Sequence, residues 1–98
     1  MNKQSIHVFA KWQITEGELN TVLDYLPQLA EKSTAEPGNL YYKVYQDNAD
    51  PNSIMLAEAY QDEEALTAHL NSKHYQDIVV AKIVPLLKER QVMLTHEL

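Results

Sequence analysis

Hydrophobic and polar side chains alternate along residues 6–14, a pattern that predicts a β-strand. Apolar residues then recur across residues 19–30 at the spacing of one helix face, with 3.6 residues per turn. We expect this helix to begin at a capping box made by Thr15 and Glu18. Pro27 lies inside the apolar stripe and lacks an amide proton, so a kink is expected there.

The middle of the chain has the pattern of a β-hairpin. Residues 36–38 (Glu-Pro-Gly) end the helix and turn the chain. Residues 39–46 are rich in tyrosine and valine, which favour strands, and residues 53–60 resume the same pattern. The intervening segment 47–52 consists largely of turn-forming residues. The two strands are therefore expected to pair.

The last third predicts a broken helix and a closing strand. Asp62 is expected to cap a helix that continues to about His69. A break follows near Ser72, which is expected to cap a second helical piece, and Pro85 disturbs the end of that piece. Alternation over residues 91–98 predicts the final strand. The apolar face of the second helical piece consists of Tyr75, Ile78, Val79, Ile83 and Leu86.

The predicted order of elements is β-α-β-β-α-β, which is typical of a ferredoxin-like α+β sandwich. The chain has 98 residues, while one domain typically takes about 100–200, so residues 1–98 are interpreted as a single domain. A chain of this size buries only about 60–70% of its unfolded surface, so a partner subunit would add to its stability.

Both faces of the predicted sheet carry apolar side chains, although only one face can be covered by the two helices. Large exposed apolar patches usually mark interfaces, so the second face predicts a homodimer formed sheet to sheet. The alternative is that these side chains are scattered on the surface. The residues on the second face are Phe9, Tyr41, Tyr45, Met55, Ala57, Ala59 and Met93.

Composition excludes several classes of function. The chain has no cysteine, so disulfides, thiolate nucleophiles and cysteine-bound metals are excluded. Its formal net charge of −6 repels phosphate backbones and anionic lipids, so neither nucleic acid nor a membrane is expected as a partner. The chain start shows no signal-peptide pattern and no apolar run is long enough to span a bilayer, so we expect a cytoplasmic protein.

Two histidines are the first candidates for chemistry. His69 and His74 flank the predicted helix break, which would let both side chains converge, and Tyr75 follows directly. Histidine gains and loses a proton near neutral pH and is the commonest general acid or base. The alternative is that each histidine caps a helix or is half-exposed. A metal bound by both histidines and Glu58 is not expected, because their spacing matches no ligand motif.

Glu58 shares a strand phase with apolar residues, which is unusual for a carboxylate. An isolated buried charge is costly, so this side chain must be paired, protonated or facing a cavity. Its role is therefore either catalytic or that of an ion-pair partner for Lys11 or Lys43 on a neighbouring strand.

Aromatic and polar residues of the strands offer further candidates. Trp12 either forms a flat wall for an aromatic ligand or simply packs in the core. Asn39 and Tyr41 begin the second strand, where Asn39 could also complete the turn. His7 and His96 lie on outer strands, where polar pairing on the sheet surface accounts for them.

Three short motifs resemble the antibiotic biosynthesis monooxygenase family. They are residues 36–42 (EPGNLYY), residues 58–60 (EAY) with 62–66 (DEEAL), and His69 with residues 72–75 (SKHY). The resemblance extends over essentially the whole chain and implies a dimeric ferredoxin-like fold. Family members include cofactor-free oxygenases of anthrones and quinols, haem-degrading enzymes and an autoinducer-processing isomerase. The haem-degrading members use an asparagine, a tryptophan and a histidine; this chain has His69 and Val79 at the matching helix positions, so haem degradation is not expected.

From the resemblance and these residues, the leading hypothesis is a cofactor-free monooxygenase without metal, flavin or haem. An aromatic or quinol-type substrate would bind against Trp12 and Tyr60, and His69 would remove a proton, with His74 as the second candidate base. The resulting anion would itself reduce dioxygen. The candidate hydrogen-bond donors to the developing oxyanion are Asn39, Tyr41 and Tyr75.

Two other hypotheses use the same cavity. An isomerase would move a proton beside the carbonyl of a small hydroxyketone and would need no dioxygen. A dimeric binding module would hold a small apolar molecule without turnover. An RNA-binding domain of the same topology is disfavoured by the negative charge and by the absence of its basic-aromatic strand motif.

Overall fold

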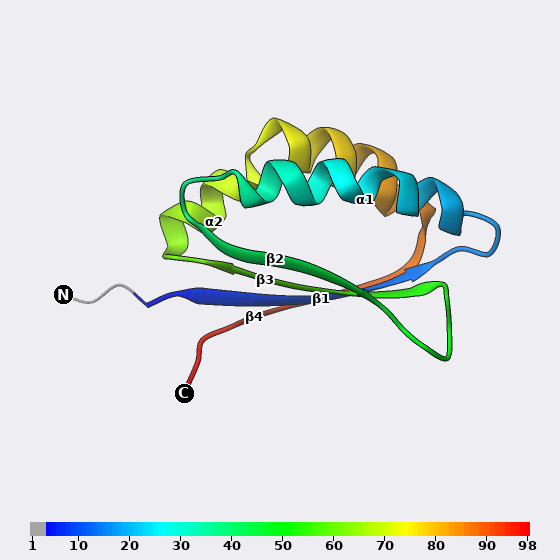
Figure 1. Cartoon of the computed structure of the whole chain (residues 1–98), viewed down its shortest axis with the longest axis horizontal. Coiled ribbons are helices and arrows are strands. Elements are labelled where there is room, and N and C mark those ends of the chain that lie inside the picture. Colours follow the sequence, from blue (N-terminus) through cyan, green and yellow to red (C-terminus); the bar gives the residue numbers. More distant parts are fainter. Residues whose placement is uncertain (1–3) are drawn as a thin grey trace.

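The computed structural model describes residues 4–98 as one antiparallel sheet with helices on one side (Figure 1). The sheet has four strands in the order β2-β3-β1-β4. This is the predicted ferredoxin-like arrangement. The elements in chain order are β1 (Ile6–Ile14), α1 (Leu19–Thr34), β2 (Asn39–Gln46), β3 (Ser53–Tyr60), α2 (Glu63–Leu70), the π-helix η1 (Tyr75–Ile83), the 3₁₀-helix η2 (Val84–Leu86) and β4 (Leu87–Thr95).

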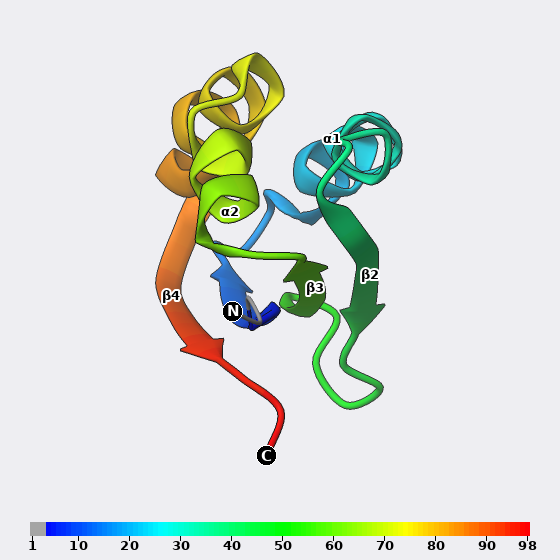
Figure 2. The same ribbon diagram turned by 90° about the vertical axis from the view of Figure 1, so that its left-hand side faces the viewer.

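The core lies between the sheet and the helical layer. Figure 2 shows α1 above the β2 side of the sheet, while α2 and the C-terminal helical segments lie toward β4. Alternate residues of β1 are buried under the helices, as its period of two predicts. The helix α1 contributes Val22 and Leu29, and η1 contributes Ile83. No helix within residues 4–98 is long and apolar enough to cross a membrane.

The start of α1 differs from the prediction. Glu18 occupies the N-cap position and no side chain caps the helix, so the capping box with Thr15 is wrong. Gly17 adopts a positive φ of 89°, and the amide of Glu18 bonds the Thr15 carbonyl in a backbone turn. The left-handed residue thus delays the helix to Leu19. The helix continues past Pro27 to Thr34 as one element.

The helix break near Ser72 is confirmed. Asp62 caps α2 by accepting from the Ala65 amide at 2.8 Å. Ser72 Oγ donates to the His69 carbonyl at 2.6 Å and accepts from the Tyr75 amide at 3.2 Å. The segment that follows is a π-helix, where we expected ordinary helical spacing.

The last strand begins four residues earlier than predicted and ends three residues earlier. It extends over Leu87–Thr95 instead of residues 91–98. Its first residues are largely charged and show no alternation, but they pair with β1, for example Arg90 with Trp12. Charged side chains suit an edge strand, so pairing rather than hydrophobic pattern sets this boundary.

The second face of the sheet exposes a set of large apolar side chains. Phe9 is 43% exposed and Met93 is 64% exposed, and Tyr45 and Met55 are also exposed. Ala59 is an exception, because it is fully buried. The apolar character predicted for this face is therefore present on the surface of the single chain.

Candidate functional site

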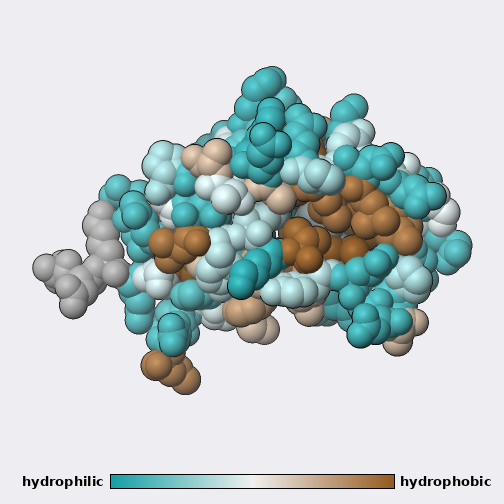
Figure 3. Space-filling model, in the orientation of Figure 1, coloured by the Kyte–Doolittle hydropathy of each residue, from teal (hydrophilic) through white to brown (hydrophobic). Residues whose placement is uncertain are grey.

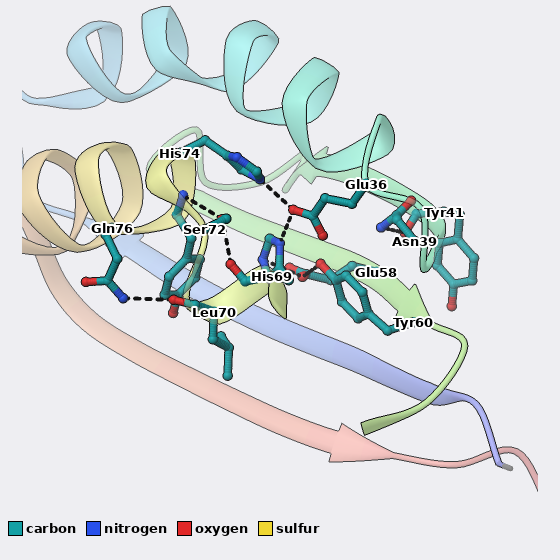
Figure 4. Close-up of polar contacts among 11 residues, drawn as sticks. Glu36, Asn39, Tyr41, Glu58, Tyr60, His69, Leu70, Ser72, His74 and Gln76 are labelled. Atoms are coloured by element: carbon teal, nitrogen blue, oxygen red, sulfur yellow. Dashed lines mark hydrogen bonds and ion pairs between the residues drawn. The ribbon is translucent and has the colours of Figure 1, made fainter. Parts of the chain in front are cut away.

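Two histidines from separate segments converge on one carboxylate oxygen of a third residue, Glu36. Glu36 lies in the bend after α1, His69 in the last turn of α2, and His74 directly before η1. Glu36 Oε2 accepts from His69 Nδ1 at 2.7 Å and from His74 Nε2 at 2.5 Å (Figure 4). We call Glu36, His69, His74 and the neighbouring Glu58 the His–Glu cluster.

Local packing explains why Glu36 reaches α2. The bend continues into Gly38, whose carbonyl accepts from the Gln61 amide at 2.9 Å. A Cβ atom at Gly38 would lie 2.3 Å from the Cβ of Ala65, so only glycine allows this close approach to α2. Ser72 then interrupts the helix, and the His74 ring lies with its centroid 5.9 Å from that of His69.

On the sheet side, His69 faces a second carboxylate. His69 Nε2 lies 3.5 Å from Glu58 Oε1, and the Tyr60 hydroxyl donates to the same oxygen at 2.6 Å. Glu58 is only 7% exposed. Burial raises the pKa of this carboxyl, although the Tyr60 hydrogen bond and His69 act in the opposite direction. Glu58 therefore keeps its proton to higher pH than an exposed glutamate.

Tyrosine rings surround His69, which is 2% exposed. The ring centroids of Tyr60, Tyr75 and Tyr42 lie 4.9, 5.1 and 6.3 Å from that of His69. Burial, and then the nearby Glu58, raise the pKa values of Tyr42 and Tyr60. Both hydroxyls thus stay neutral and can serve as hydrogen-bond donors.

The cluster has the chemistry of a proton-transfer site. Because Glu36 accepts from Nδ1 of His69, the other ring nitrogen, Nε2, is left to take up a proton. Beside it stands a carboxyl whose pKa is raised. An imidazole nitrogen beside a carboxyl is a pair of groups that enzymes use as base and acid.

The same atoms also constitute a possible set of metal ligands. One ligand atom from each of Glu36, His69 and His74 lies within 4.8 Å of the others. Zinc needs each ligand atom about 2.0–2.2 Å from a common centre. In this structure the carboxylate oxygen itself is at hydrogen-bonding distance from both nitrogens, so cation binding would require these side chains to move apart.

The structure brings together five of the residues selected from the sequence. His69, His74 and Glu58 belong to the cluster, and Tyr60 and Tyr75 contact His69. The expected alternative for Glu58, an ion pair with Lys11 or Lys43, is absent: among described residues its contacts are Tyr60 and His69.

Three other candidates are placed elsewhere. Trp12 is buried in the central core, 2% exposed, and forms no wall of the cluster. Tyr41 points away from the cluster toward the second face, where its hydroxyl lies 2.8 Å from His7 Nδ1 (Figure 4). Asn39 donates its amide to the Tyr41 carbonyl at 3.1 Å, within the start of β2. Strand phase thus directs Trp12 into the core and Tyr41 to the opposite face, so neither side chain lies at the cluster.

Sequence reasoning missed Glu36 as a functional residue. The segment 36–38 was interpreted only as the end of a helix, because Pro-Gly is a strong turn signal. The motif at residues 36–42 was the one available indication that this glutamate had a further role.

Two surface hollows adjoin the helical layer. A groove of about 650 Å³ lies between the start of α2 and the end of β4 and includes Leu66 and Leu94. An apolar hollow of about 390 Å³ separates α1 from β2 and includes Leu26, Val44 and Tyr42 (Figure 3). Leu66 lies one helical turn before His69, and the Tyr42 ring centroid lies 6.3 Å from that of His69. No residue of the cluster itself lines either hollow.

Comparison with known families agrees with this architecture. The family model described as antibiotic biosynthesis monooxygenase matches residues 5–81. The chain belongs to this family. The matched segment contains the whole His–Glu cluster. A solved antibiotic biosynthesis monooxygenase is 26% identical, with a TM-score of 0.88 and coverage of 95% of this chain and 98% of that one.

Further relatives were found among curated proteins and solved structures. An isomerase of (4S)-4-hydroxy-5-phosphonooxypentane-2,3-dione from Yersinia enterocolitica is 38% identical over 69 residues, covering 63% of this chain and 72% of that protein. The enzyme of the same name from Salmonella paratyphi B is 33% identical over 66 residues, covering 67% and 69%. A structure from Pseudomonas aeruginosa shares the fold with a TM-score of 0.91 at 23% identity, covering 100% and 98% of the two chains.

Proposed function

We propose that this protein is an isomerase that interchanges the hydroxyl and carbonyl groups of neighbouring carbons in a small phosphorylated hydroxydione. The observation that carries the proposal is the His69 ring held between two carboxyl groups, with Glu36 accepting from Nδ1 and Glu58 facing Nε2. The relatives named as isomerases of such a dione support the same substrate class.

The first half of the reaction forms an enediol. His69 Nε2 takes the proton from the carbon that bears the hydroxyl, and the electron pair of that C–H bond becomes the new C=C bond. The carbonyl electrons of the neighbouring carbon move to its oxygen, which takes the proton of Glu58. General acid–base catalysis of this kind contributes about 10²–10⁴-fold in rate.

The second half returns both protons to exchanged positions. His69 delivers its proton to the former carbonyl carbon, and Glu58 takes the proton of the original hydroxyl, whose carbon becomes the carbonyl. No oxidant or reductant is consumed. Glu36 stabilises the positive charge on His69 between the two steps. His74, which is nearer the surface, donates a hydrogen bond to the same carboxylate oxygen.

The test follows the carbon-bound proton. The dione is incubated in D₂O under nitrogen, and NMR detects both the isomer and deuterium at carbon. Wild type is expected to convert the dione, and His69→Gln to lose at least 100-fold in rate. His7→Gln, on the second face of the sheet, is the matched control and should retain activity. Absence of both conversion and exchange in folded wild type would refute the isomerase.

A cofactor-free monooxygenase remains the second candidate, because the family model carries that description. The same base would remove a phenolic proton, and the substrate anion would then reduce dioxygen. Oxygen uptake with hydroquinones, anthrones and catechols distinguishes the two functions. Uptake above autoxidation that is lost in His69→Gln, together with no conversion of the dione under nitrogen, would favour the oxygenase.

A further inference from the structure

We infer that Arg90, together with Tyr75, binds the phosphate ester of the substrate and thereby determines specificity for phosphorylated over unphosphorylated hydroxydiones. This inference rests on the proposed function, since it assigns one group of the proposed substrate to a place in the site. Arg90 is the only arginine of the chain and lies beyond the segment that matches the family model.

The register of the sheet directs Arg90 toward the cluster. Arg90 on the edge strand β4 pairs with Trp12 on β1, whose side chain is buried under the helices. Side chains directly opposite each other in paired strands lie on the same face. Arg90 therefore belongs to the helix-covered side of the sheet, where its Nη2 donates to the Tyr75 hydroxyl at 2.7 Å.

Tyr75 links the guanidinium to the candidate base. Its ring meets that of His69 edge-on, with centroids 5.1 Å apart. One tyrosine ring thus separates Arg90 from His69. A phosphate bound at Arg90 would therefore lie beside the same tyrosine whose ring contacts His69.

Arg90 is available to bind an anion. Its side chain is exposed, and no carboxylate of residues 4–98 forms an ion pair with it. A guanidinium has five N–H donors, and Tyr75 engages one nitrogen, so a bidentate contact with phosphate oxygens is still open. Arg90 also acts across the site, as one of the groups that lower the pKa of Glu58 against the larger effect of burial.

The surface of β4 beside Arg90 is also exposed. Val92 and Leu94 follow it at alternate positions on the same face of β4 and are 49% and 60% exposed. Leu94 also lines the groove of about 650 Å³ next to α2. A substrate can therefore lie along β4, with its carbon chain over apolar side chains and its phosphate at Arg90.

The net charge of −6 makes this local cation important. A phosphate dianion is repelled by the overall field of the protein, so it needs a specific positive group to bind. Arginine suits this role better than lysine, because its planar fork matches phosphate oxygens in two places.

The experiment separates this inference from the proposed function. Binding of inorganic phosphate is measured by titration calorimetry, without any turnover, for wild type, Arg90→Gln, Arg90→Lys and Lys43→Gln. Lys43→Gln is the matched control, because this substitution removes one positive charge from the second face of the sheet. There, Lys43 Nζ lies 5.5 Å from the Tyr41 ring centroid. Far-UV circular dichroism checks folding, and the exposed position of residue 90 favours intact variants.

Arg90→Gln is expected to weaken phosphate binding about 10- to 100-fold, as for loss of a charge-assisted contact. Lys43→Gln should change binding less than threefold, and Arg90→Lys should give an intermediate loss. In the isomerase assay, Arg90→Gln should raise KM for the phosphorylated dione about 10- to 100-fold with kcat changed less than about threefold. Because the unphosphorylated dione lacks the group that Arg90 binds, its KM should change less than about threefold in Arg90→Gln.

Equal phosphate binding by wild type and Arg90→Gln would overturn the inference. Isomerase activity with a KM insensitive to Arg90→Gln would also overturn it while leaving the proposed function intact. Arginine-dependent phosphate binding in a protein that does not isomerise the dione would support the phosphate site and refute the isomerase.

Discussion

Replacing Glu36 with glutamine removes the negative charge that two histidines share while keeping the shape of the side chain. The carboxylate oxygen Oε2 accepts from both His69 and His74, and the other oxygen, Oε1, is buried with no hydrogen-bond partner among residues 4–98. In Glu36→Gln the amide oxygen can still accept from the histidines, but it carries no charge. The variant therefore isolates the electrostatic contribution of Glu36.

The magnitude follows from the two hydrogen bonds. A hydrogen bond to a charged group contributes about 1.5–3 kcal/mol and a neutral one about 0.5–1.5 kcal/mol, so each bond loses roughly 1–1.5 kcal/mol. His69 becomes cationic during proton abstraction, which is when the charge of Glu36 matters most. Since about 1.4 kcal/mol corresponds to tenfold in rate, kcat should fall about tenfold if only the His69 bond contributes and about 100-fold if both do.

The assay is the initial rate of dione isomerisation under nitrogen for wild type, Glu36→Gln and Glu31→Gln. Glu31 is an exposed glutamate on α1 and controls for loss of one charge. We expect KM to change little, because Glu36 touches the base rather than the substrate in this mechanism. A folded Glu36→Gln protein with kcat within twofold of wild type would show that the carboxylate does not assist His69.

Three further predictions concern stability and assembly. Burial raises the Glu58 pKa above its ordinary value of 4.5, so the protonated carboxyl stabilises the fold below pH 4.5 and this stabilisation is lost as pH rises through the raised pKa. In urea unfolding, the free energy of unfolding of Glu58→Gln should therefore increase relative to that of wild type as pH rises. A difference that does not change with pH would contradict this. Gly38→Ala places a Cβ 2.3 Å from Ala65 Cβ and should lower the free energy of unfolding by about 1–3 kcal/mol, whereas unchanged stability in urea would mean that α2 moves freely. The exposed apolar side chains on the second face should form a homodimer in light scattering, with Phe9→Lys/Met93→Lys giving a monomer; a monomeric wild type would refute this interface.

The fold could be predicted because its signals are local. Alternation in β1 and helical spacing in α1 each depend on residues within a few positions of one another, and the Asp62 and Ser72 caps lie next to the helices they begin. The prediction failed where a signal was weak or non-local. Pairing with β1 determines where β4 begins, and the conformation of Gly17 determines where α1 begins.

The site was predictable only in part, for the same physical reason. The sequence by itself determined that His69 and His74 flank a helix break and that Glu58 lies in an apolar strand phase, so three of the four cluster residues could be selected. Only the tertiary structure decided that Glu36 joins them, since it is 33 and 38 positions away from the two histidines. Packing of the bend after α1 against α2 creates that contact. In the same way, pairing of β4 with β1 directs Arg90 toward Tyr75. The residue types identify the groups that can act as acid or base. Which of these groups share a hydrogen bond depends on distances between residues far apart in the sequence, and a local sequence pattern contains no information about those distances.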